Sequence, residues 1–137
     1  MASGYSNWGK NYVLDVIFGN DSPEATYYIG LVKSDIPTVT DTGASIDEVS
    51  GGSYSRVAMT NNTTNFPGAT DGAKEIGTVV TFPTASADWG TVKYFVICDA
   101  STNGNLVGWG QLAVAKTINN GQTARFPIGS LRITQNQ

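Results

Sequence analysis

Acidic residues are the side chains of this sequence that come closest to catalytic chemistry, and their spacing gives them no catalytic partner. The chain has 11 acidic residues, one cysteine and no histidine. Without histidine it lacks the commonest general base, the usual partner of a nucleophilic serine or cysteine, and the commonest metal ligand. A serine–lysine or paired-carboxylate site remains possible in principle. Neither Glu48 with Glu75 nor Asp88 with Asp99 has a spacing that argues for one, so we expect no enzymatic activity.

Metal, phosphate and thiol sites are not indicated either. Asp41 and Asp47 flank Gly43, but the ordered oxygen ligands of a calcium loop are missing between them. The glycine-rich residues 50–53 lack the Gly-Lys-Ser/Thr ending of a phosphate loop. Cys98 alternates with apolar residues in a strand-like run, which predicts a buried, inert thiol, and a lone cysteine forms no intrachain disulfide. We therefore predict no cofactor.

The aromatic side chains could form either a packed core or a surface on which sugars stack. The chain has three tryptophans and six tyrosines. Core packing is the default, because aromatic residues dominate cores and interfaces alike, and we predict structural roles for Trp89 and Trp109. If one of them is exposed instead, we expect it to be Trp89, which lies at a chain corner just before a predicted strand.

Charge is low and unevenly distributed along the 137 residues. The net charge is −3, so the basic footprint of a nucleic-acid-binding protein is missing. Segment 34–55 contains acids and no base, whereas segment 111–137 contains bases and no acid. The acidic segment of one copy could contact the basic segment of another, or both could simply be solvated. The charged residues concerned are Asp35, Asp41, Asp47 and Glu48 in the first segment, and Lys116, Arg125 and Arg132 in the second.

Targeting and membrane segments are not apparent in the sequence. The first four residues lack the basic region and apolar core of a secretory signal. No apolar run approaches the ~20 residues that a membrane-spanning helix needs. We therefore expect a protein that is made in a cytoplasm and has no membrane partner.

The elements that position these side chains are predicted to be mostly strands. Residues 6–18 have helical apolar spacing, with Ser6 or Asn7 as a cap and Gly19 at the end, so they predict one short N-terminal helix. The rest of the chain alternates short β-rich runs with glycine, proline and asparagine turns, which is typical of an all-β, antiparallel β-sandwich of jelly-roll type. We expect residues 1–137 to form a single domain. The predicted strands are 26–33, 54–60, 75–82, 91–99, 106–112, 114–118, 122–126 and 131–134.

The predicted helix is also a candidate interface. Its apolar stripe includes Trp8, Tyr12 and Ile17 and is too wide to be left in water. We expect it to pack against the sandwich or against a neighbouring subunit. Exposed strand edges carry few charges here, so we also expect neighbouring copies to close some of them.

Several short motifs, taken in order, resemble a group of small tailed-phage virion proteins variously labelled capsid decoration (cement), head fibre or tail fibre proteins. The resemblance covers nearly the whole chain, including the N-terminal helix. It implies a virion structural protein whose partners are the major capsid protein or other virion proteins. The motifs are strand 27–32 followed by Ser34-Asp35, then segment 48–56, Phe82-Pro83, segment 87–92, Gly108-Trp109-Gly110 and segment 126–131.

Two functions follow from this resemblance. The first is a capsid decoration or cement protein that binds and stabilises the major capsid lattice, as a homotrimer matching the local threefold positions of that lattice. The alternative is a tail or head-fibre module that binds a host-surface carbohydrate through exposed aromatic side chains. Either protein would be located in the virion.

Overall fold

The computed structural model describes residues 3–19 and 21–135, and within them strands dominate. One helix lies near the N-terminus and nine strands make up the rest of the regular structure of this described part. The predicted all-β class with one short N-terminal helix is confirmed. The elements are β1 Ser3–Tyr5, α1 Asn7–Ile17, β2 Thr26–Val32, β3 Val57–Thr60, β4 Ala73–Glu75, β5 Val80–Thr84, β6 Gly90–Cys98, β7 Leu106–Ile118, β8 Thr123–Phe126 and β9 Arg132–Thr134.

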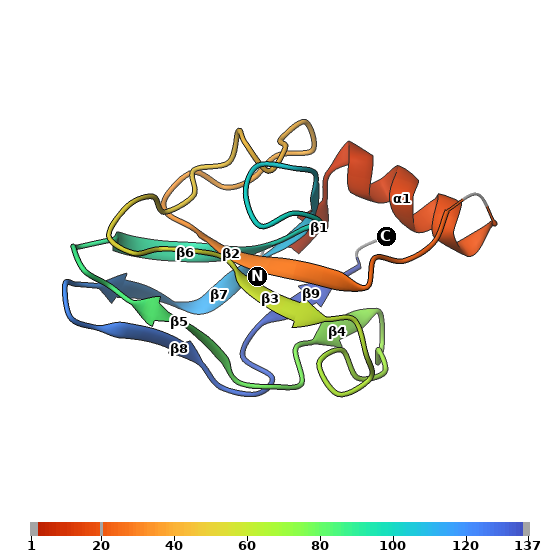
Figure 1. Ribbon diagram of the computed structural model, residues 1–137. Coiled ribbons are helices and arrows are strands. Elements are labelled where there is room, and N and C mark those ends of the chain that lie inside the picture. Colours follow the sequence, from red (N-terminus) through yellow and green to blue (C-terminus); the bar gives the residue numbers. More distant parts are fainter. Residues whose placement is uncertain (1–2, 20, 136–137) are drawn as a thin grey trace.

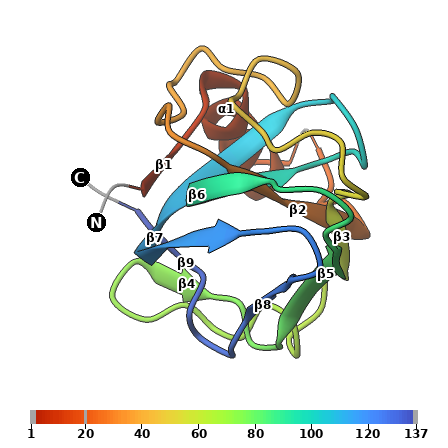
Figure 2. The same ribbon diagram turned by 90° about the vertical axis from the view of Figure 1, so that its left-hand side faces the viewer.

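The strands form an antiparallel sandwich, as predicted. A five-stranded sheet has the order β1-β7-β6-β2-β3, and two further sheets pair β4 with β9 and β5 with β8. The two small sheets lie together on one side of the large sheet (Figures 1 and 2). Most pairings join segments far apart in the sequence, and the β6–β7 and β2–β3 pairs are the ones formed by consecutive strands.

The large sheet is apolar on both of its faces. On β6, Val92 and Phe95 belong to the main core between the sheets. Val96 and Cys98 belong to a second cluster on the opposite, outer face, together with Leu106. Because side chains alternate across a strand, a sheet with two apolar faces needs a cover on each. The small sheets cover one face, and irregular segments described below cover the other.

Three strand predictions differ from the structure. Residues 106–112 and 114–118 form one strand, β7, because a bulge absorbs the irregular stretch: Tyr94 opposes Gln111 while Val92 opposes Lys116. Predicted strand 75–82 is split into β4 and β5. The second of these continues through Pro83, where the register shifts, so the missing proline N–H interrupts no regular ladder. The short β1 was not predicted, since three residues are too few to show a period.

The helix begins and ends where its sequence predicted. Ser6 is the N-cap and its hydroxyl accepts a hydrogen bond from the Gly9 N–H at 2.9 Å. The same hydroxyl donates to the Leu106 carbonyl, which ties the first helical turn to β7. Gly9, an unfavourable residue for a helix, is needed here because a Cβ at this position would lie 1.9 Å from the Val107 carbonyl oxygen.

The outward half of the helix remains uncovered by the rest of the chain. Gly9 and Tyr12 are buried against the sandwich, whereas Ile17 and Phe18 are exposed. The expectation that the apolar stripe packs against the sandwich therefore holds for its Tyr12 side, while Ile17 is left largely in solvent.

Replacing Gly9 with alanine should detach the helix from β7. We expect Gly9→Ala to lower the free energy of unfolding by about 1–3 kcal/mol, the usual cost of overpacking, although alanine favours the helix itself. Gly68→Ala is the matched control, because a Cβ at Gly68 would meet no atom within 4 Å. Urea unfolding measures both variants, and equal stabilities would contradict this account of helix docking.

Candidate functional site

Two irregular segments lie over the outer face of the large sheet. We define residues 34–55 and 99–105 as the loop platform; near the end of the first segment, Val49 and Tyr54 pack on the main core instead. Both segments run along the same side of the sheet in Figure 1. They touch directly, since the Gly43 N–H donates to the Gly104 carbonyl at 3.0 Å.

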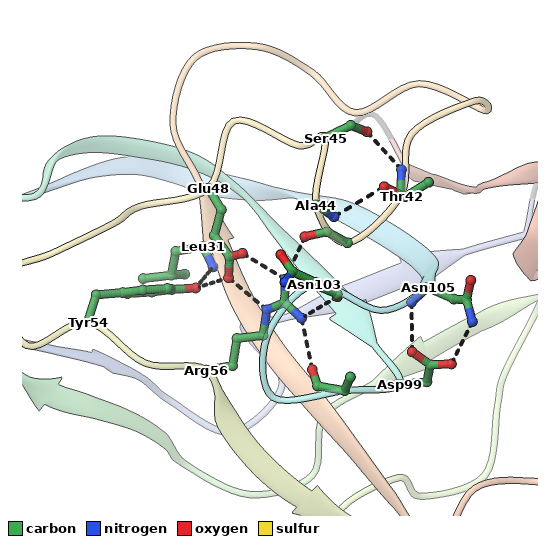
Figure 3. A network of polar contacts seen from close by, with 12 residues as sticks. Leu31, Thr42, Ala44, Ser45, Glu48, Tyr54, Arg56, Asp99, Asn103 and Asn105 are labelled. Atoms are coloured by element: carbon green, nitrogen blue, oxygen red, sulfur yellow. Dashed lines mark hydrogen bonds and ion pairs between the residues drawn. The ribbon is translucent and has the colours of Figure 1, made fainter.

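The side chain of Arg56 lies beneath the platform and joins its parts. It is 1% exposed. One terminal nitrogen donates to the carbonyls of Ala100, at 2.8 Å, and Asn103, at 3.0 Å, and the other donates to the Gly43 carbonyl at 2.8 Å. Figure 3 shows these bonds converging on one guanidinium from both segments. Arg56 therefore fixes the two parts of the platform relative to each other.

Glu48 neutralises the Arg56 charge. Its carboxylate accepts from Nε at 2.8 Å and from a terminal nitrogen at 2.7 Å, a two-point geometry that suits the planar guanidinium. Burial alone would lower the pKa of Arg56, but the hydrogen bonds and charge of Glu48 outweigh it and raise that pKa. The cation therefore persists although it is buried.

Tyr54 connects this ion pair to the core. Its hydroxyl donates to Glu48 at 2.5 Å and accepts from the Leu31 N–H of β2 at 2.9 Å (Figure 3). Its ring packs between Phe82 and Trp89, with ring centroids 6.1 and 5.3 Å away. Burial and the negative charge of Glu48 raise the pKa of Tyr54, so the hydroxyl keeps its proton and remains a donor.

Glycines in the sequence make this close assembly possible. A Cβ on Gly43 would lie 1.9 Å from the Asn103 carbonyl oxygen, so the two segments meet only where a side chain is absent. A Cβ on Gly30 of β2 would lie 2.6 Å from a Glu48 carboxylate oxygen. Gly104 has a φ of 70°, in the left-handed region that glycine adopts readily, and it turns the second segment toward Arg56.

Asp41 and Asp47, predicted as interface acids, shape the platform from within. Asp41 accepts from the Thr38 N–H at 2.8 Å and from the Ser45 hydroxyl at 2.6 Å. Although burial opposes it, these bonds lower the pKa of Asp41. Asp47 accepts from the Ser34 N–H at 3.0 Å and lies 3.8 Å from Lys33 Nζ. Both carboxylates hold loop backbone in place.

The basic candidates lie in the other layer of the sandwich. Arg125 is exposed on β8, and Arg132 on β9 lies 3.9 Å from Glu75. Within one chain, the ion pairs of the described residues join neither arginine to Asp41, Asp47 or Glu48.

The aromatic candidates divide into two buried rings and one partly exposed pair. Trp89 is buried, and its Nε1 donates to the Gly52 carbonyl at 2.8 Å. Trp109 is buried in the outer-face cluster, with Gly4 against its ring. Trp8 stacks on Tyr12 at 4.8 Å between ring centroids and stays partly exposed. Neither Trp89 nor Trp109 offers an open ring face.

Sequence reasoning missed Arg56 as the organising residue of this site. The sequence did place an acid, Glu48, and a base, Arg56, eight residues apart in one motif, with Tyr54 between them. Gly51 and Gly52 lie between the two residues and indicate a turn, so the spacing does not predict that the two side chains meet.

The chemistry available at this site is structural. Among residues 3–19 and 21–135, no three metal-binding side chains gather, and no helix is long and apolar enough to span a membrane. Arg56 donates to Glu48 and to backbone carbonyls, and Glu48 also accepts from the Tyr54 hydroxyl. The arrangement is suited to holding a surface in a fixed shape, which is what a structural binding module requires.

The fold and the site thus define an all-β structural protein whose most organised feature is a braced loop surface. The chain belongs to the family of the podophage GP4 fiber I protein gp80, whose family model matches residues 4–134. It is therefore a phage fibre protein, a structural component located in the virion, and the resemblance drawn from its motifs is confirmed. No curated protein matches the chain.

Removing the buried cation should destabilise the protein far more than removing an exposed one. Arg56→Met leaves Glu48 without its partner, for which we expect a loss of about 3–5 kcal/mol. Arg132→Met, which breaks an ion pair whose side chains are half exposed, should cost about 1 kcal/mol or less. Urea unfolding compares the two variants. Similar losses in both would show that Arg56 is not a special support.

Cys98 should report on the integrity of the outer-face cluster. Burial raises the pKa of its thiol to about 12. Since the thiolate is the reactive form and a raised pKa delays its formation, iodoacetamide at pH 9 should label the chain in urea but not the folded protein. Mass spectrometry counts the adducts. Rapid stoichiometric labelling without urea would place Cys98 in a site open to solvent.

Proposed function

We propose that this fibre protein is attached to the phage head and decorates the capsid, with the loop platform as its contact to the major capsid protein or another virion protein. The observation that carries the proposal is the Arg56 network. It holds some thirty residues of irregular backbone in one shape without using them for catalysis.

A surface fixed in advance suits a permanent contact. Binding through a mobile loop costs conformational entropy, and a loop already ordered in the free protein avoids most of that cost. The platform is ordered by buried charge, by Asp41 and Asp47, and by contact between its two segments. A virion component, which binds once and must survive outside the cell, benefits from such a surface.

The platform also carries apolar side chains that could anchor a partner. Ile36 and Val39 are exposed on its first segment. The Val39 carbonyl accepts from the Asn7 N–H at 2.7 Å, so this part of the platform is tied to the start of α1. Exposed apolar side chains on a rigid surface can become the buried anchors at the centre of a protein interface when a partner binds.

Carbohydrate binding, the other function that the sequence left open, has less support. It calls for open aromatic faces, and Trp89 and Trp109 are buried. Of the three tryptophans, Trp8 would have to carry it, and one face of this ring already stacks on Tyr12. The braced platform favours a protein partner.

The proposal predicts that introducing carboxylates at the exposed apolar positions of the platform prevents incorporation of the protein into particles. We expect Ile36→Asp with Val39→Asp to fold normally, because both side chains are exposed, and to reduce the copies per virion at least tenfold. Val114→Asp, at an apolar side chain that is 79% exposed on β7, is the matched control and should incorporate normally. Quantitative mass spectrometry of purified virions provides the count. Normal incorporation of the double variant would sink the assignment of the platform.

The same preparations distinguish head from tail. A copy number that scales with the capsid lattice supports decoration of the head, whereas one that scales with the tail assembly contradicts it. Particles lacking this protein should lose DNA at a lower temperature if it also acts as cement.

A further inference from the structure

The C-terminal half of α1 presents an apolar ridge to solvent. Leu14 is 53%, Ile17 65% and Phe18 76% exposed. Leu14 and Phe18 are four residues apart and so lie one above the other on the outward side of the helix. Large exposed apolar side chains that gather on one element mark an interaction surface more often than scattered ones do.

An apolar pocket of about 550 Å³ adjoins this ridge, and Ile17 belongs to both. The pocket lies at the end of the sandwich where α1 and β4 stand in Figure 1. Its walls are mainly aromatic and aliphatic: Tyr27, Phe66, Ile76, Phe95, Ile97 and Ile133. The main core is therefore open at this end, and the helix leaves the opening partly uncovered.

The end of the helix carries acidic residues, and the pocket wall carries Lys74. The last turn of α1 contains no basic residue, and Asp21 and Glu24 follow it, so this end of the helix is acidic and carries the negative end of the helix dipole. Lys74 and Glu75 of β4 both line the pocket, and the Glu75 carboxylate lies 3.9 Å from Arg132. A ridge from one molecule entering the pocket of another would bring Asp21 toward Lys74.

We propose that the occupant of this pocket is the helix end of a second copy of the chain, with Phe18 inserted and Leu14 and Ile17 covering the rim. The ridge and the pocket are contiguous, so one contact buries both surfaces on each molecule. The pocket is large enough for a phenyl ring together with an aliphatic side chain. Because every copy carries both parts, two copies can each insert a ridge into the other's pocket in a closed two-fold contact.

This contact goes beyond the proposed function and does not depend on it. The ridge and pocket lie at the α1 and β4 end of the sandwich, while the platform covers the outer face of the large sheet (Figure 1). Self-association would therefore leave the platform free for a virion partner. Failure of either proposal leaves the other standing.

Light scattering coupled to size-exclusion chromatography tests the contact in the purified full chain. We expect the unaltered protein to form a discrete oligomer, and Phe18→Asp to weaken association at least tenfold without unfolding the monomer. Val114→Asp, an equally exposed apolar position on β7, should associate like the parent. A monomeric parent at high concentration, or equal weakening by Val114→Asp, would overturn the proposal.

Two further variants test the specific partners. Lys74→Glu should weaken the oligomer, and adding Asp21→Lys should restore it, whereas additive weakening would contradict the charge pairing. Phe18→Cys protein mixed with Thr63→Cys protein should form a disulfide-linked heterodimer under mild oxidation, because Thr63 lines the pocket. Absence of this product while the oligomer persists would show that the second copy binds elsewhere.

Discussion

The arrangement of the outer face depends on one buried cation. The guanidinium of Arg56 uses all of its N–H groups, donating to Glu48, Ala100, Asn103 and Gly43. Arginine cannot lose its proton at any physiological pH, so a buried arginine must find this many acceptors or remain costly. The need to satisfy it draws the two segments of the platform together. These segments also cover Val96 and Cys98, which would otherwise face water.

Helices and strands with a regular apolar period were predictable from the sequence. Hydrogen bonds from a side chain to backbone carbonyls of distant residues were not. The helix showed itself by apolar spacing and a Ser6 cap, and the long strands by alternation. The full length of β7 was not predicted because its bulge breaks that alternation. Arg56 was missed because three of its hydrogen bonds go to backbone carbonyls, and a carbonyl carries no sequence signal. The sequence left open whether Asp41 and Asp47 contact another copy or are solvated, and it did not show that both carboxylates bond loop backbone of their own chain.

The rigid loop platform and the exposed apolar surface at α1 lie on different parts of the molecule, which suits a virion fibre protein. The platform is a closed network in which polar groups satisfy one another, so it can present a constant shape. The end of the sandwich at α1 is the reverse, with apolar side chains that lack a cover from their own chain. The two proposed contacts, one to a virion partner and one to a second copy, would use these two surfaces, which lie on different parts of the sandwich.

Hydrogen exchange of the platform amides tests the central claim most directly, with Arg56→Lys compared to the parent chain. Lysine keeps the charge but loses the planar fork that reaches both segments. The account predicts that protection of the Gly43 amide, bonded to Gly104, and of the Asn105 amide, bonded to Asp99, falls together. The amides of the β5–β8 pair should be unchanged. Retained protection in Arg56→Lys, or loss in one segment alone, would contradict the claim that Arg56 joins the two.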